Sequence, residues 1–92
     1  MTSINERLEA LAARHGVDEM LEDRGQSISD PMPIEFGNKR NVKMGAKGFL
    51  LQRFPVTLYA PSLLRFLREE NIEALVRFLE DNEDSLSWGR EE

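Results

Sequence analysis

The sequence predicts a single α+β domain over residues 1–92, with helices at both ends of the chain and a three-stranded antiparallel sheet between them. Apolar residues recur every three or four positions near the two ends, which is typical of one face of a helix. In the middle they alternate with polar residues, which is typical of strands. The 40% of hydrophobic residues is enough for one core in a chain of 92 residues.

The amino-terminal part is predicted to form a helix or helix pair. Ser3 and Glu6 have the spacing of a capping box, in which each side chain accepts a hydrogen bond from the other residue's backbone N–H. An apolar stripe follows over residues 4–15, and Gly16 suits the left-handed residue that ends a helix. A shorter helix is expected over residues 18–24. Residues 1–25 therefore form an acidic helical part.

Residues 34–59 are predicted to form a basic β-meander. Pro55 cannot donate to a strand ladder, so it marks an edge position or a bulge in the last strand. Glycines occupy both predicted turns, as hairpin connections require. Strands and turns are expected in the following order: strand 34–36, turn 37–40, strand 42–44, turn 45–48 and strand 49–59.

The helical period returns over residues 61–82. Its leucines and other apolar residues form two stripes, so the segment is either one helix or two, and Asn71 could cap the second. We expect these one or two carboxyl-terminal helices to be packed on one face of the sheet. Residues 83–92 form an acidic tail, in which Trp88 is a candidate anchor to the body of the domain.

Charge is divided unevenly along the chain. The net charge of −5 comes from −5 over residues 1–35, +7 over residues 36–68, which contain no acid, and −7 over residues 69–92. Acidic ends around a basic middle indicate either two faces with different partners or ends that pack electrostatically against the middle.

The basic middle predicts a contact surface for nucleic acid or for an acidic groove of a partner. Arg53 lies beside the edge proline, and the compact part of the cluster falls on two turns and the strand between them. Such cations attract phosphates by displacing counterions. The alternative is an ordinary solvated hairpin, whose charges block aggregation. The cations of the compact part are Lys39, Arg40, Lys43 and Lys47.

Three aromatic rings near this cluster are candidates for stacking on nucleobases: Phe49, Phe54 and Tyr59. The alternative for the phenylalanines is that they fill the core.

The short helix over residues 18–24 has the wrong charge for a DNA-binding helix-turn-helix. As the second helix of that motif it would have to enter the major groove, where its carboxylates would be repelled by the phosphates. We therefore exclude this class. The same carboxylates favour contact with a basic protein surface that normally holds nucleic acid. They are Asp18, Glu19, Glu22 and Asp23.

Catalytic and metal-binding patterns are weak. His15 is the single histidine and has no nucleophile or metal ligand at a recognisable spacing, so a structural role at a helix end is expected. No cysteine is present for thiol chemistry. Residues 81–84 lack the glycine and the distal glutamate of a calcium loop. Residues 45–48 match the G-x-x-G loop of KH domains, but strands flank them. We expect no enzyme, cofactor or metal.

The segment R-F-P-V-T-L-Y at residues 53–59, followed by a helix with leucines at positions 63, 64 and 67, resembles small proteins encoded by phages and prophages. The likeness covers about the last half of the chain, and many such proteins have a tryptophan in place of Leu63 or Leu64. The strand-then-helix order also resembles the fold of the single-stranded-DNA-binding transcriptional coactivators.

The phage resemblance implies one further class, the anti-CRISPR proteins. These are small, cytosolic, usually non-enzymatic and often acidic. They occupy the protein or guide-RNA surface of a host surveillance complex. No motif defines the class, so no functional residue is carried over from it.

The favoured hypothesis is a non-enzymatic, phage-type protein that inhibits a host nucleoprotein complex. Two alternatives stay open: a direct single-stranded nucleic-acid-binding protein that uses the basic hairpin, and an assembly protein whose charged faces pair between subunits. The expected partners are a host protein or ribonucleoprotein complex and RNA or single-stranded DNA. No secretory signal or apolar run of about 20 residues is visible, so we expect a cytoplasmic protein with no membrane partner, in the host cytoplasm if a phage encodes it. We expect a monomer or a dimer.

Overall fold

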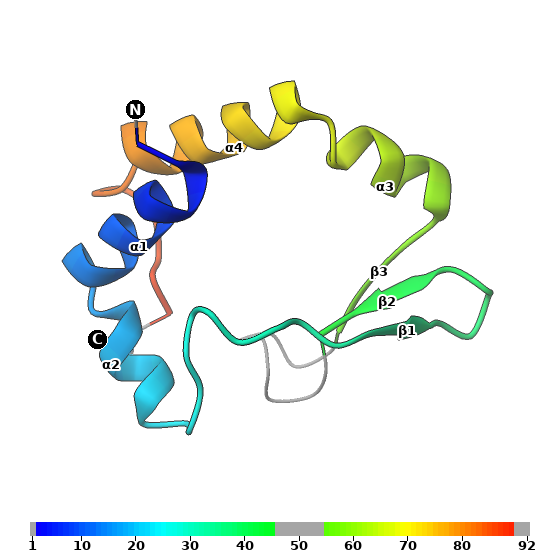
Figure 1. The fold of residues 1–92 in the computed structure, drawn as a ribbon, viewed down its shortest axis with the longest axis horizontal. Coiled ribbons are helices and arrows are strands. Elements are labelled where there is room, and N and C mark those ends of the chain that lie inside the picture. Colours follow the sequence, from blue (N-terminus) through cyan, green and yellow to red (C-terminus); the bar gives the residue numbers. More distant parts are fainter. Residues whose placement is uncertain (1, 46–54, 90–92) are drawn as a thin grey trace. The chain divides into compact units, whose positions relative to one another are not determined.

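A computed structural model describes residues 2–45 and 55–89 of the chain. It confirms the mixed α+β class, with helices before and after a three-stranded antiparallel sheet (Figure 1). The described elements are, in order, α1 (Ile4–Arg14), α2 (Val17–Glu22), β1 (Ile34–Phe36), β2 (Val42–Met44), β3 (Val56–Leu58), α3 (Ala60–Phe66) and α4 (Glu69–Asp81).

The chain divides into two compact units. Met1–Asp30 and Glu69–Glu92 form one, which we call the helical unit and which contains α1, α2 and α4. Pro31–Arg68 forms the other, which we call the sheet unit and which contains the three strands and α3. No helix within the described residues is long and apolar enough to span a bilayer.

The start of α1 has the capping box that its sequence predicts. The Ser3 hydroxyl accepts a hydrogen bond from the Glu6 backbone N–H at 3.1 Å, and the Ser3 N–H donates to Glu6 Oε1 at 2.8 Å. Two otherwise unsatisfied donors are thereby paired. Gly16, with a φ of 70°, separates α1 from α2, and Gly25, with a φ of 71°, follows α2. Both glycines adopt the left-handed conformation that suits them at helix ends.

The core of the helical unit lies where α1 meets α4. Leu11 and Ala12 of α1 and Val76 of α4 are its buried hydrophobic residues. These positions belong to the apolar stripes that the helical periodicity predicts on the two helices. The packing partner of α4 is thus a helix from the opposite end of the chain.

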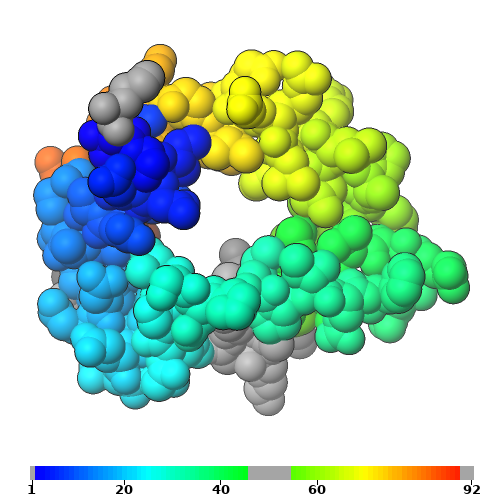
Figure 2. All heavy atoms as spheres, viewed as in Figure 1, coloured from blue at the N-terminus to red at the C-terminus, as the bar shows by residue number. Residues whose placement is uncertain are grey.

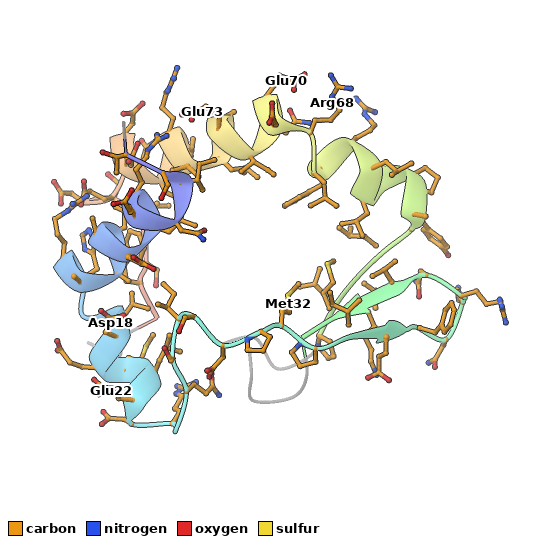
Figure 3. The ribbon with its side chains drawn as sticks, viewed as in Figure 1. Asp18, Glu22, Met32, Arg68, Glu70 and Glu73 are labelled. Atoms are coloured by element: carbon orange, nitrogen blue, oxygen red, sulfur yellow. The ribbon has the colours of Figure 1, made fainter. Side chains whose placement is uncertain are left out.

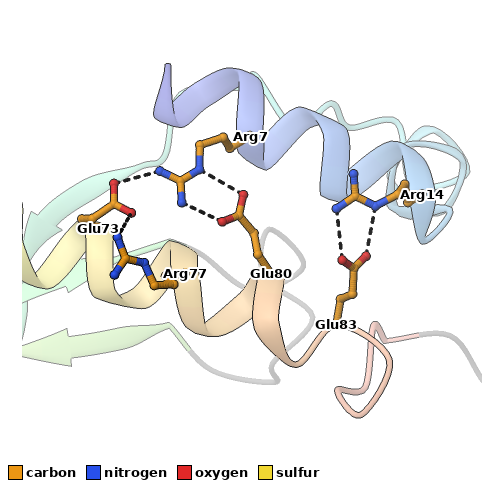
Figure 4. Close-up of polar contacts among 6 residues, drawn as sticks. All are labelled: Arg7, Arg14, Glu73, Arg77, Glu80 and Glu83. Atoms are coloured by element: carbon orange, nitrogen blue, oxygen red, sulfur yellow. Dashed lines mark hydrogen bonds and ion pairs between the residues drawn. The ribbon is translucent and has the colours of Figure 1, made fainter. Parts of the chain in front are cut away.

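Arg7 joins α1 to α4 at the edge of this core (Figure 4). Its guanidinium donates two hydrogen bonds to Glu80, at 3.0 and 2.6 Å, and one to Glu73 at 2.8 Å. The bidentate pair with Glu80 uses the planar fork of arginine, which lysine lacks. Hydrogen bonds from Arg7 hold the pKa of Glu73 and of Glu80 below its ordinary value of 4.5.

A second cluster fixes the segment after α4 to the end of α1. Glu83 accepts hydrogen bonds from Arg14 at 3.0 and 3.2 Å and lies 2.8 Å from His15 Nε2. The Trp88 ring stacks on His15 with centroids 4.3 Å apart, and its indole N–H donates to the Glu83 carbonyl at 2.8 Å. Trp88 therefore anchors the carboxyl-terminal segment, and His15 has packing and hydrogen-bonding roles there.

The sheet unit has the strand order β1-β2-β3, with both neighbouring pairs antiparallel. Residues that oppose one another lie on the same face, so the register divides the sheet into an apolar face and a polar face. The polar face carries Glu35, Lys43 and Thr57. The apolar face carries Ile34, Phe36, Val42, Met44, Val56 and Leu58.

The helical segment after the sheet consists of two helices, which the sequence left open. Pro61 lies in the first turn of α3, where its missing N–H costs nothing. The chain leaves helical geometry after Phe66, and α4 begins at Glu69, two residues before the expected cap Asn71. The third strand is Val56–Leu58, so the bounds expected for it are wrong at two described residues: Pro55 precedes the strand, and Tyr59 is the N-cap of α3. Residues 49–54 of the expected strand lie outside the described part.

The ion pairs between α1 and α4 predict that acid destabilises the helical unit. Glu73, Glu80 and Glu83 have a folded-state pKa below the ordinary 4.5, so the unfolded chain binds more protons as the pH falls through this region. Their contribution is present above about pH 4.5 and is lost as the pH falls further. Denaturant titrations followed by circular dichroism, from about pH 7 down to about pH 3, measure this loss.

Arg7→Gln should lower the free energy of unfolding near neutral pH and flatten its decrease in acid. Arg24→Gln is the matched control, because Arg24 is exposed and forms no ion pair among the described residues. Equal acid sensitivity of the wild type and Arg7→Gln would contradict the proposed role of the pair.

Candidate functional site

The predicted basic turn between β1 and β2 is a tight loop with a fixed geometry. The Gly37 N–H donates to the Asn41 carbonyl at 2.9 Å, and the Arg40 N–H donates to the Gly37 carbonyl at 3.1 Å. A Cβ on residue 37 would collide with the Asn41 side chain, so glycine at this position lets Asn41 keep its place in the turn. Lys39 and Arg40 are both exposed in this loop, which belongs to the green part of the chain in Figure 2.

Arg40 adopts a backbone conformation that arginine rarely occupies. Its φ is 56°, and it is the only described residue other than glycine with a positive φ. Hairpins with three-residue loops commonly place glycine at this left-handed position. A side chain there costs about 1–2 kcal/mol. The turn therefore carries a basic side chain at a position where glycine would be less strained.

The Arg40 guanidinium lies over the ring of Phe36, with Cζ 5.4 Å from the ring centroid. Phe36 ends β1 and is 77% exposed. A cation over the face of an aromatic ring is attracted by the ring quadrupole. The two side chains and Lys39 form a small exposed group, which we call the hairpin site.

Lys43 differs from the other two hairpin cations. It lies on the polar face of the sheet, opposite Glu35 in the register, and its Nζ is 3.1 Å from Glu35 Oε2. Phe36 lies on the other face. The carboxylate offsets part of the lysine charge, so Lys43 contributes less positive potential to the hairpin site than Lys39 or Arg40.

The remaining predicted basic residues, Lys47 and Arg53, lie outside the described residues, as does the turn over residues 46–48. The same holds for two of the predicted stacking rings, Phe49 and Phe54. The third, Tyr59, precedes α3 and is 54% exposed.

The four predicted acidic residues lie on or next to α2, in the helical unit. Asp18 and Glu22 lie one helical turn apart (Figure 3), and Glu19 has the same spacing from Asp23, the residue after the helix. Three of the four are exposed, and Asp18 is half-buried. None of these side chains has a hydrogen bond or ion pair within the described part of the chain.

A metal-binding cluster is not found among the described residues. No group of three or more His, Asp or Glu side chains there could hold a metal ion. In the acidic turn after α4, Glu83 is engaged by Arg14 and His15, and the Asn82 side chain donates to the Phe78 carbonyl at 2.9 Å.

The hairpin site also contains Phe36, which the sequence did not single out as a candidate stacking ring. Its alternation with Glu35 places it on the apolar face, which suggests burial, and the structure leaves it exposed. The available signal was its position, one residue before the turn that contains Lys39 and Arg40.

The comparisons with known proteins add no further assignment. No family model, no curated protein and no solved structure matches this chain.

The strain at Arg40 predicts that glycine and alanine substitutions differ in stability there in the opposite sense from their order at most positions. Arg40→Gly should be more stable than Arg40→Ala by about 1 kcal/mol, because only glycine adopts a positive φ without a steric cost. At Lys39, whose φ is not positive, the order should reverse by about 0.5–1 kcal/mol, because glycine has more freedom in the unfolded chain. Urea unfolding of the four variants, with hydrogen exchange of the hairpin amides, measures both differences. Alanine equal to or better than glycine at position 40 would contradict the strain.

Proposed function

We propose that this protein is a non-enzymatic binding protein that contacts nucleic acid through the hairpin site. The observation that carries the proposal is the pair of adjacent, exposed cations in the β1–β2 turn, Lys39 and Arg40. Neither forms an ion pair with a carboxylate among the described residues, and the surrounding block of residues 36–68 contains no acid. Their charge is therefore available to a polyanion.

The turn geometry supports a phosphate contact. The two hydrogen bonds between Gly37 and its partners hold the loop in one conformation, so little backbone entropy is lost when a phosphate binds. Arginine and lysine that neutralise phosphates release condensed counterions, which favours binding and makes it dependent on salt. The expected location, the host cytoplasm, is a compartment in which nucleic acid is accessible.

The proposal predicts a salt-dependent affinity that Lys39→Gln reduces. The slope of log affinity against log salt should become shallower by about one unit, because one phosphate contact is lost. Fluorescence anisotropy with a labelled oligonucleotide, repeated over a range of salt concentrations, measures the slope. Arg24→Gln is the matched control, since Arg24 is an exposed cation of the helical unit with no ion pair among the described residues, and its loss should leave the slope unchanged.

Two results would overturn the proposal. One is the absence of nucleic-acid binding by the wild-type protein at low salt. The other is an equal effect of Lys39→Gln and Arg24→Gln, which would show that only the overall charge matters. Lys43→Gln should have a smaller effect than Lys39→Gln, because Glu35 already neutralises part of the Lys43 charge.

A second candidate function is the inhibition of a host nucleoprotein complex, in the manner of the anti-CRISPR proteins. The observation that favours it is the acidic surface of α2, whose four carboxylates lack ion-pair partners among the described residues. Such a surface complements protein regions that are basic because they hold nucleic acid. The hairpin site would then meet the RNA of the same complex.

Charge reversal tests this candidate. Glu22→Lys with Asp23→Lys should abolish co-purification of a CRISPR effector complex from a nuclease-treated host lysate. Cations at the end of a helix are compatible with its dipole, so α2 should remain folded. Glu9→Lys is the control, because Glu9 is an exposed acid on α1, outside the predicted surface. Equal capture by all three proteins, or capture by none, would remove this candidate.

A further inference from the structure

The Phe36 side chain is exposed to solvent although it is apolar. Phenylalanine is among the residues most often buried, yet this ring is the most exposed of the large hydrophobic side chains that the structure describes, at 77%. It lies at the end of β1 and next to a turn that is held by hydrogen bonds. The ring is therefore presented on a well-defined part of the backbone.

Arg40 adds a second, independent observation. It keeps an arginine side chain at a positive φ, and the guanidinium lies 5.4 Å from the Phe36 centroid. Strained backbone positions that carry a large side chain are common at ligand-binding sites. Here the strain places a planar cation beside a planar ring.

A ligand for this pair must offer a flat π surface and a nearby negative charge. Nucleobases stack on aromatic rings and on guanidinium planes, and a phosphate follows each base along the chain. Lys39, one residue from Arg40 and exposed in the same turn, can hold that phosphate. In a duplex the faces of the bases are covered by their neighbours, so only an unpaired base can stack on a protein ring.

We propose that Phe36 and Arg40 form a stacking site for an unpaired nucleobase, so that the hairpin site selects single strands over duplexes. This inference rests on the proposed nucleic-acid binding, and it assigns the preference for single strands to the Phe36 ring. Phosphate contacts alone would hold single strands and duplexes without distinguishing them by their bases.

The apolar face of the sheet offers a matched control for this assignment. Ile34 lies on the same face and in the same strand as Phe36 and is 67% exposed, but it has no planar ring. A partner protein that covers the apolar face would use Ile34 and Phe36 alike. A stacked base would use Phe36 and leave Ile34 without effect.

The test compares a labelled single-stranded oligothymidylate of about 12 nucleotides with a duplex of equal length. The wild type should prefer the single strand. Phe36→Leu should weaken single-strand binding by about tenfold, the loss expected for one stacked base, and leave duplex binding unchanged. Phe36→Tyr should retain the preference, and Ile34→Ala should change neither affinity. Circular dichroism confirms that each variant is folded.

A second readout reports stacking directly. In Phe36→Trp the new indole should be quenched by the single strand and not by the duplex. The emission of the wild type, whose tryptophan stacks on His15 in the helical unit, should stay constant.

The outcomes separate the two proposals. Absence of binding to either oligonucleotide overturns the proposed function and this inference together. Salt-dependent binding without a single-strand preference, or with no effect of Phe36→Leu, overturns the stacking site alone. Parallel losses in Phe36→Leu and Ile34→Ala assign the apolar face to a protein partner and also overturn it.

Discussion

The helical unit depends on the ion pairs of Arg7 with Glu73 and Glu80, because they join helices from opposite ends of the chain. Arg7 contacts Glu73 and Glu80 of α4 across 66 and 73 residues of sequence. Arg14 and His15 contact Glu83 in a similar way, and the Trp88 ring stacks on the His15 ring. Two arginines of α1 thus pair with the acids that follow β3 and α3 in the sequence. The two terminal segments are both acidic, and they are held together by two arginines of the amino-terminal segment, which pair with glutamates of the carboxyl-terminal segment.

The remaining charges differ in whether they are paired. The carboxylates of α2 have no ion-pair partner among the described residues, and neither have Lys39 and Arg40 of the β1–β2 turn, whereas Lys43 is paired with Glu35. Pairing is therefore selective: the charges that hold the fold are bidentate or partly buried, and those available to partners are exposed. In the hairpin site, unpaired charge lies next to an exposed ring and an arginine with a positive φ, and this arrangement is the basis of the proposed base stacking.

Much of the fold could be predicted because its signals are local. The capping box at Ser3, the left-handed glycines at positions 16 and 25, and the alternation in β1 and β2 each depend on residues within a few positions of one another. The candidate site was predicted less completely. Lys39 and Arg40 lie in the expected turn, but the partner of Lys43 depends on strand register and the exposure of Phe36 on what covers the sheet. Neither property is encoded by spacing along the chain.

The sequence by itself determined the order of the helical and strand segments, the separation of charge into three blocks and the place of the basic turn, because helix caps, periodicity and turn chemistry act over a few residues. Only the tertiary structure decided that α4 packs on α1, that Trp88 stacks on His15 and that Arg40 lies over Phe36. The first two join residues more than 60 positions apart, and the third depends on a positive φ that sequence rules assign to glycine. These three contacts depend on helix packing and on backbone geometry, which also determine which charged side chains have no ion-pair partner.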